Sequence, residues 1–244
     1  MTRWSVKTWL CLTMVVSVLA AGRTAWAQDA PPVKDSPIRT FVLVDQVEYV
    51  VDERSGALRF NGLGWIGGDY NRIWINAEGT KLRNGSLSDT DVQVLYGRLI
   101  SPYWDLQGGV RYFRPGSSAP SSTTAVIGIQ GLAPYRLEVQ AAAFLGGESR
   151  VAARLEVEYD LLLTQRLIAQ PRVAIDLAAR ASKEQGMSRG INDAEISFRV
   201  RYEIKREVAP YAGIAWTRSS NAQSDGPAAG GRGFSLVIGA RVWY

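Results

Sequence analysis

Residues 194–205 read AEISFRVRYEIK, and this stretch indicates the fold class. Apolar and polar side chains alternate along it without a break, which is the period of a β-strand with one apolar and one wet face. An amphipathic helix would repeat about every 3.6 residues, and no segment after Arg39 sustains that period. The apolar face consists of Ala194, Ile196, Phe198, Val200, Tyr202 and Ile204, and the polar face of Glu195, Ser197, Arg199, Arg201, Glu203 and Lys205.

The same alternation recurs at residues 137–141 and 151–161 and extends, less regularly, over most of the chain. It predicts twelve strands whose bounds are defined to within a few residues. We place them at about 41–52, 57–67, 70–79, 89–100, 103–113, 123–132, 135–145, 150–163, 167–181, 193–206, 209–218 and 233–244.

The connections between these strands alternate in length from Gly68 onward. The short ones are Gly68-Asp69, Ser101-Pro102, Ala133-Pro134, residues 164–166 and Glu207-Val208; the longer ones are residues 80–88, 114–122, 146–149, 182–192 and 219–232. Short periplasmic turns with longer external loops are typical of outer-membrane barrels. We therefore expect an all-β protein, a closed antiparallel transmembrane β-barrel over residues 41–244, with both of its ends on the periplasmic side. Pro171 lies inside a predicted strand, where we expect a bulge or a position near the rim.

A secreted β-sandwich or a lipocalin-like barrel remains the soluble alternative. Two features favour the membrane instead: several strands carry charges on their polar face, and residues 234–244 alternate up to an aromatic last residue. That tail resembles the recognition signal of bacterial outer-membrane proteins. Aromatic residues near predicted strand ends would form interface girdles. These are Trp65, Tyr70, Tyr103, Trp104, Tyr135, Tyr211, Trp243 and Tyr244.

The first 27 residues are typical of a cleaved signal peptide. Arg3 and Lys7 precede an apolar run over residues 8–21, and Ala25-Trp26-Ala27 forms a cleavage site. The run is short for a spanning helix, which needs about 20 residues. Residues 28–40 contain three prolines and no apolar run, which predicts a flexible periplasmic tail.

Composition excludes several functional classes. The sequence has no histidine, which removes Ser/His/Asp and Cys/His hydrolases and His-ligated zinc sites. Of the 28 basic residues, three lie in the signal peptide, which leaves 25 against 23 acidic ones and no basic run for nucleic acid. We do not expect an enzyme. A twelve-stranded membrane phospholipase is the enzyme alternative, and its hydroxyl nucleophile would lack the usual base.

The polar faces of the strands predict a charged lumen. A barrel of this size is intermediate between small, filled barrels and open porins. Glu156, Glu158 and Asp160 would form either a cation-attracting wall or one half of a set of ion pairs that fills the lumen. The predicted network comprises Arg111, Glu138, Arg154, Glu156, Glu158, Asp160, Arg172, Asp176, Glu195, Arg199 and Arg201.

The turn at residues 164–166 fixes a register. It sets Leu163 opposite Leu167. Stepping outward by twos then predicts that Asp160 lies near Gln170. The same register predicts the cross-strand ion pairs Glu158 to Arg172 and Arg154 to Asp176.

Several strings in the chain are similar to those of a known family. They are GWIGGDY at 64–70, SPYWDLQ at 101–107, QGLAPY at 130–135, EYDLLLTQRL at 158–167, QPR at 170–172, DAE at 193–195, RYEI at 201–204 and APY at 209–211. Together they resemble the bacterial copper resistance protein B family over essentially the whole barrel. The resemblance implies an outer-membrane protein of copper homeostasis and detoxification, surrounded by outer-membrane lipid, which binds or passes copper ions beside a periplasmic multicopper oxidase.

One departure from the family concerns the metal ligands. Members commonly carry a Met- and His-rich segment ahead of the barrel, because Cu(I) prefers thioether or thiolate ligands and Cu(II) prefers imidazole. Residues 28–40 contain neither, and Met187 is the one methionine after the signal peptide. The metal candidates are therefore weak: Glu156, Glu158, Asp160, Glu195 and Met187. Met187 is alternatively a solvated loop residue, and the alternative function is a narrow porin or structural barrel with no copper-specific site.

Overall fold

The computed structural model describes residues 37–51, 56–83, 85, 87–116, 120–146, 150–181, 187–220 and 232–244. These residues form one antiparallel sheet with a single short 3₁₀ turn, η1 (Pro134–Arg136), and no helix among them is long and apolar enough to cross a membrane. The strands are β1 (Arg39–Val51), β2 (Gly56–Gly67), β3 (Asn71–Leu82), β4 (Leu87–Ser101), β5 (Trp104–Pro115), β6 (Ser122–Ala133), β7 (Leu137–Gly146), β8 (Arg150–Tyr159), β9 (Leu161–Leu162), β10 (Leu167–Ala178), β11 (Gly190–Tyr202), β12 (Val208–Ser219) and β13 (Arg232–Trp243).

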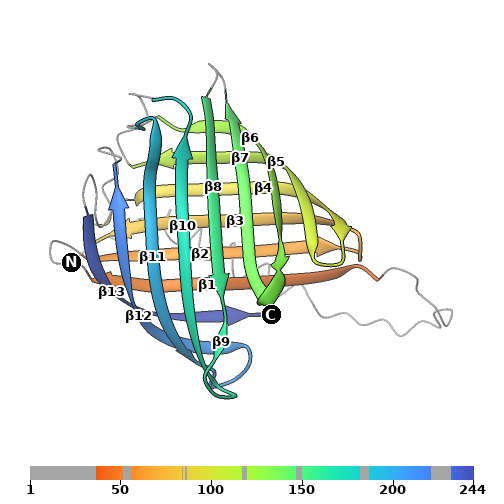
Figure 1. The fold of residues 1–244 in the computed structure, drawn as a ribbon, viewed down its shortest axis with the longest axis vertical. Coiled ribbons are helices and arrows are strands. Elements are labelled where there is room, and N and C mark those ends of the chain that lie inside the picture. The colour runs from red at the N-terminus through yellow and green to blue at the C-terminus, as the bar shows by residue number, and fades with distance from the viewer. Residues whose placement is uncertain are drawn as a thin grey trace, which may run out of the picture. The chain divides into compact units, whose positions relative to one another are not determined.

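The sheet closes on itself into a barrel. Each strand pairs with its neighbours in sequence, β10 pairs with both β8 and β11, and β1 pairs with β13. The strands follow one another around the barrel wall (Figure 1). The two-residue β9 continues β8, because Leu161 faces Ala169 in the same register that places Glu158 opposite Arg172. Counted in this way the barrel has twelve strands, as the alternation predicts.

Pro171 interrupts hydrogen bonding without shifting the register. The ladder between β10 and the β8–β9 strand lapses between Arg172 and Ala169, and resumes in the same register. On the other side, Pro171 faces Phe198 within a regular run of pairs. Of the two expected outcomes, the bulge is therefore absent, and Pro171 lies four residues from the turn-rim end of β10. The missing N–H of proline costs a ladder bond, and the flanking residues keep the alignment.

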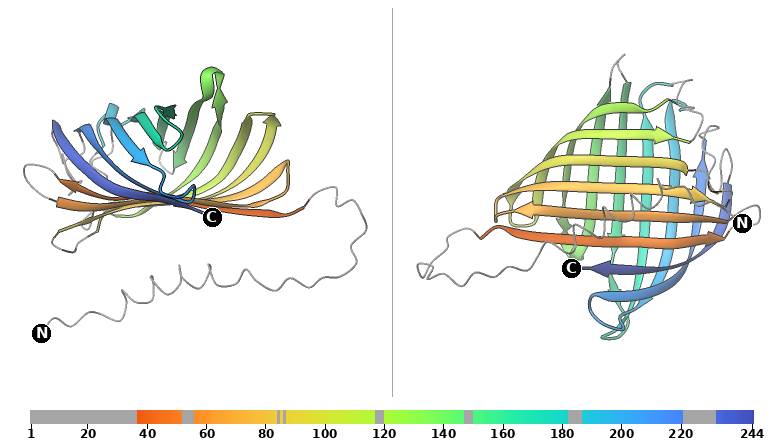
Figure 2. Two further views of the ribbon diagram at one scale, coloured as in Figure 1. Left: turned by 90° about the horizontal axis from the view of Figure 1, so that it is seen from below. Right: turned by 180° about the vertical axis from the view of Figure 1, so that it is seen from behind.

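The first and last strands meet in a seam that brings the two ends of the barrel to one rim. The Val42 amide donates to the Tyr244 carbonyl at 2.9 Å, and the Tyr244 amide donates back to the Val42 carbonyl at 2.8 Å. The strand ends that the short connections join lie at this same rim, which we call the turn rim. The strand ends that the longer connections join lie at the opposite rim, which we call the loop rim (Figure 2). Since outer-membrane barrels keep their short turns in the periplasm, we assign the turn rim to that side.

One turn differs from its predicted position. The strand expected to reach residue 206 ends at Tyr202, and residues 203–207 form the connection to β12. The carbonyl of Arg206 accepts a hydrogen bond from Trp243 Nε1 at 2.5 Å, and the carbonyl of Glu207 accepts one from the Trp243 amide. The sequence continues to alternate through Glu203 and Lys205. This segment nevertheless forms a turn, which is hydrogen-bonded to Trp243 of β13.

The outer face of the barrel is apolar and the inner face is mixed. Ile75, Ile127 and Ile196 are each 53% exposed on the outside, and Ile238 is 64% exposed. The residues that alternate with outward-facing side chains point inward, as buried Arg199 and Arg201 do between exposed Phe198 and Tyr202. An apolar surface of this extent on the outside belongs in lipid, so the molecule is a membrane barrel and not a soluble sandwich.

Aromatic side chains surround the turn rim, with two exceptions. Tyr70, Tyr103 and Tyr244 are at least 66% exposed there, as an interface girdle requires. Trp65 and Tyr211 were expected in this girdle, but both point into the lumen. The Trp65 ring lies 6.0 Å from that of Trp74, and Tyr211 is 6% exposed. Their positions in the strands put them on the inner face, which nearness to a strand end does not reveal.

Candidate functional site

One side of the lumen is filled with apolar side chains. Trp74, Leu95, Val126 and Phe144 come from β3, β4, β6 and β7, and each is at most 5% exposed. Leu63, Trp65, Ala142 and Ala152 pack against them. Each core residue lies between outward-facing apolar neighbours, as Trp74 does between Ile73 and Ile75. Both faces of these strand segments are therefore apolar, and the alternation that marks a wet face is lost there.

The opposite side of the lumen holds buried ion pairs, and Glu48 of β1 has the least exposed carboxylate among them. It is 0% exposed and accepts hydrogen bonds from three groups. Arg59 donates at 3.2 Å, Arg199 at 3.1 Å and the Tyr211 hydroxyl at 3.1 Å. A fully buried carboxylate needs such partners because the free-energy cost of its desolvation is otherwise not offset.

Arg172 links this cluster to β8. Its Nε donates to Glu156 at 2.6 Å, and its Nη1 donates to Glu195 at 3.4 Å. Glu195 also accepts from Arg59 at 2.9 Å, so Arg59 joins Glu195 to Glu48. The predicted ion pair between Arg172 and Glu158 does not form. The register is the predicted one, but the long guanidinium arm reaches the neighbouring inward carboxylate on β8 and a third strand.

Glu158 and Asp160 share an amide instead. Gln170 Nε2 donates to Glu158 at 2.6 Å and to Asp160 at 3.1 Å, which confirms the expected nearness of Asp160 and Gln170. Asp160 is also ion-paired with Arg201. On the other side of β8, Glu158 lies directly opposite Glu138 of β7.

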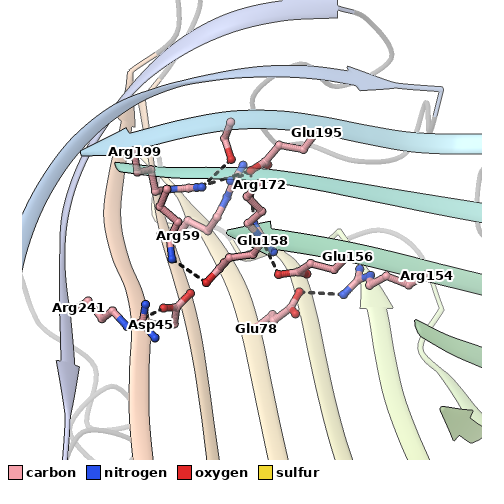
Figure 3. Close-up of polar contacts among 12 residues, drawn as sticks. Asp45, Arg59, Glu78, Arg154, Glu156, Glu158, Arg172, Glu195, Arg199 and Arg241 are labelled. Atoms are coloured by element: carbon pink, nitrogen blue, oxygen red, sulfur yellow. Dashed lines mark hydrogen bonds and ion pairs between the residues drawn. The ribbon is translucent and has the colours of Figure 1, made fainter. Parts of the chain in front are cut away.

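Arg154 forms the second predicted pair and extends across the lumen. Its Nε donates to Asp176 at 2.7 Å, which confirms that prediction. Its Nη1 donates to Glu78 of β3 at 3.0 Å and lies 3.7 Å from Asp91 of β4. Because β3 and β8 are not neighbours in the sheet, this contact ties opposite walls together (Figure 3). Arg111 completes the link, since it pairs with Asp91 at 2.7 Å and lies over Phe144, with its guanidinium carbon 4.0 Å from the ring centre.

Two cavities lie on either side of these ties. One, of about 240 Å³, is lined toward the loop rim by Asp89, Met187 and Ser219. The other, of about 280 Å³, is lined toward the turn rim by Leu132 and Arg241. Both are lined by Asn61, Glu78, Phe144, Arg154 and Glu156. These five side chains therefore separate the loop-end cavity from the turn-end cavity.

The turn-end cavity is the more strongly acidic of the two. Among the residues that the structure describes, two guanidinium groups line it, those of Arg154 and Arg241. The carboxylates that line it are Asp45, Glu78, Glu138, Glu156 and Glu158, and the amides are Asn61, Asn76, Gln93, Gln130 and Gln140. Asp45 is ion-paired with Arg241 at 3.2 Å. Carboxylate and amide oxygens are hard donors, which attract cations and hold soft metals weakly.

Four of the five residues expected to bind metal line the two cavities, and Asp160 lines neither of them. Glu156 and Glu195 meet at Arg172, Glu158 and Asp160 meet at Gln170, and Met187 lies apart at the loop end. In the described parts of the chain, no three or more His, Cys, Asp or Glu side chains form a group suited to a metal ion. The metal assignment of these five residues therefore stays a prediction.

Sequence reasoning missed several lumen residues. The additional ones are Asp45, Glu48, Arg59, Glu78, Asp91, Tyr211 and Arg241. A signal was available for Glu48, which alternates with Gln46 and Val50 between outward-facing Val47 and Tyr49. A bulge between Val44 and Gln46 hides it, because the phase of the alternation changes at Asp45.

Comparison with known proteins gives concordant matches. The model of the family described as Copper resistance protein B precursor matches residues 38–244. Copper resistance protein B of Escherichia coli is 38% identical over 216 residues, which cover 87% of this chain and 72% of that protein. A Copper resistance protein B homolog of Pseudomonas syringae pv. tomato matches with the same identity and coverage. Among solved structures, the NanC porin aligns with a TM-score of 0.53 over 84% of this chain and 99% of its own, at 12% identity, a likeness of fold alone.

Proposed function

The chain belongs to the copper resistance protein B family, and from this premise we propose that it takes part in copper resistance by admitting copper ions to its lumen and holding or passing them there. The barrel is located in the bacterial outer membrane, so the lumen is the part of the protein that joins the periplasm to the outside. In this proposal copper is the cargo of the barrel and not a resident cofactor.

The observation that carries this proposal is the acidic lining of the turn-end cavity. Five carboxylates and two guanidinium groups face it, and the field of this excess raises the local concentration of cations from the periplasm. Glu138 of β7 and Glu158 of β8 lie directly opposite each other on neighbouring strands. Like charges at this separation repel, and a cation between them relieves the repulsion. Oxygen ligands bind copper weakly, which suits release more than storage.

Partners and chemistry follow from the same premise. A periplasmic multicopper oxidase is the proposed partner, because the family resemblance implies one, and the turn rim is the side of the barrel that we assign to the periplasm. We propose binding or passage of copper with no catalytic step, since the sequence has no histidine to serve as a base or an imidazole ligand.

Copper uptake into vesicles tests the proposal. Proteoliposomes containing the purified protein should take up radiolabelled copper faster than protein-free vesicles, and Glu138→Gln with Glu158→Gln should reduce that uptake. Glu207→Gln, which removes an exposed carboxylate at the turn rim, is the matched control and should leave uptake unchanged. Equal permeation of copper and potassium, insensitive to both changes, would contradict the proposal and identify a narrow porin.

Two further measurements address affinity and role. Titration with Cu(I) and Cu(II) against a competing chelator should give weak binding, and sub-nanomolar affinity would mean that stronger ligands than these carboxylates are present. A deletion strain should become sensitive to copper and recover when the gene is restored. Unchanged copper tolerance would contradict the role in resistance.

A further inference from the structure

Two arginines face each other on the outside of the barrel at the loop rim. Arg218 of β12 lies directly opposite Arg232 of β13, and both are exposed. The outward direction follows from their strands: Ile214 and Leu236 are more than half exposed on the same face, whereas Ala215 and Val237 are 1% exposed on the inner face. Arg218 and Arg232 therefore lie on the outer face of their strands, and Arg218 also borders the loop-end cavity.

This placement brings two positive charges close together. Directly opposed residues of an antiparallel pair have Cβ atoms about 4.5 to 5.5 Å apart, and like charges at that separation repel. Within the described residues, no carboxylate lies within ion-pair distance of either guanidinium, and the β11 residue opposite Arg218 is Ala194. The pair is thus destabilising unless an anion lies between the two groups.

The aromatic residues below the pair set its depth in the membrane. Trp216 and Phe234 oppose each other one step closer to the middle of the same two strands, and Phe234 is 71% exposed. Aromatic side chains on the outer face of a barrel mark the level where lipid chains meet headgroups. Two residues further along a strand advance about 7 Å, which places the guanidinium groups at the level of the headgroup phosphates.

We propose that Arg218 and Arg232 bind the phosphate groups of lipid A, the phosphorylated glucosamine lipid of the outer leaflet. Guanidinium groups bind phosphate through paired, charge-assisted hydrogen bonds, and a phosphate between two of them converts the repulsion into attraction. Trp216, Phe234 and Leu236 extend below as an apolar surface for the acyl chains. The site lies on the outer face of the barrel, and its argument does not rest on the proposed copper function.

Native mass spectrometry of the purified full-length protein, titrated with lipid A, tests this site. The double variant Arg218→Gln with Arg232→Gln should bind lipid A about thirtyfold more weakly, and each single variant about fivefold. Arg98→Gln with Arg136→Gln removes two exposed arginines at the turn rim and is the control of equal charge. It should bind as the unmodified protein does. Equal losses in the two double variants would overturn the proposal, because net charge alone would then explain the binding.

Two further probes identify the group that is bound. Lipid A stripped of its phosphates should bind the unmodified protein and the Arg218→Gln, Arg232→Gln variant equally, and a preference for the unmodified protein would overturn the phosphate assignment. Inorganic phosphate should not displace lipid A at equal concentration, and displacement would indicate a free phosphate site instead. Folding is checked by the heat-dependent gel shift of barrels, and the single variants carry the test should the double variant fail to fold.

Discussion

The lumen has two sides that are built differently. On the side of β1, β8, β10 and β11, buried arginines and carboxylates satisfy one another, as Glu48 and Arg199 do at 3.1 Å. On the side of β3, β4, β6 and β7, Trp74 and Leu95 belong to a small apolar core. The charged side gains specific geometry at a high desolvation cost, whereas the apolar side gains packing without specific partners. The barrel is thus filled from both sides, and the contacts of Arg154 and Arg111 connect the two.

Glu48→Ala should cause the largest loss of stability on the charged side. Arg199 is 2% exposed and would lose its closest carboxylate, so we expect a decrease in unfolding free energy of about 3 to 5 kcal/mol. Urea unfolding in detergent measures it. Glu207→Ala, an exposed carboxylate, should change stability by less than about 0.5 kcal/mol. Similar values for both would show that the buried pair does not hold the charged side together.

Leu95→Ala tests the apolar side. Leu95 is 2% exposed, and its removal should cost about 3 kcal/mol because it leaves a cavity that the rigid wall does not close. The neighbouring Val94 is 45% exposed toward lipid, and Val94→Ala should cost less, since lipid chains fill the space. Thermal unfolding of both variants gives the comparison. An equal cost would mean that the apolar side is loosely packed.

Arg154→Ala should break the connection between the two sides. Its loss leaves Glu78 and Asp176 without this partner in a partly wet lumen, at a cost of about 1 to 3 kcal/mol. It also removes a side chain shared by the two cavities, so cation conductance in planar bilayers should rise. Arg72→Ala is the matched control: its side chain is 23% exposed, against 22% for Arg154, it pairs with Asp105 and it lines neither cavity. The conductance of Arg72→Ala should stay unchanged. A rise in this control would mean that conductance does not depend on the contacts of Arg154 across the lumen.

Glu158→Gln should have the smallest effect and tests the pairing of Arg172. A glutamine oxygen still accepts from Gln170, so the cost should be about 1 kcal/mol or less. Glu156→Gln weakens the 2.6 Å contact with Arg172 and should cost about 1.5 to 3 kcal/mol in urea unfolding. A larger loss of stability for Glu158→Gln than for Glu156→Gln would indicate that Arg172 pairs with Glu158, as the register alone predicts.

Much of the fold can be predicted from the sequence because a barrel strand in lipid must turn its apolar face outward, which the alternation of residues reveals. The predicted strand at 57–67 is observed as Gly56–Gly67, and the predicted pair Arg154 to Asp176 forms across neighbouring strands only 22 residues apart. Local register suffices for such contacts. Pro171 lacks the expected bulge because its flanking pairs hold the alignment, which a single residue cannot indicate.

The candidate site is less predictable for physical reasons. Arg199 and Glu48 are 151 residues apart and meet only because the barrel closes. The reach of Arg172 to Glu156 depends on side-chain conformation and not on register. A buried position for Phe144 can be predicted, since residues 141–145 read AAAFL and do not alternate with polar residues. Its partners in the apolar core cannot be predicted, because the curvature of the closed barrel determines which strands face it.

The seam between β1 and β13 has a consequence for biogenesis. Leu43 pairs with Trp243, two hundred residues later, and the last residue of the chain is hydrogen-bonded to Val42. Such distant contacts carry the largest loop-closure entropy, so they form after the local hairpins. Until residues 232–244 leave the secretion machinery, β1 presents an unpaired edge that is prone to aggregation. The cell must therefore shield a nearly complete sheet and release it only when its final strand arrives.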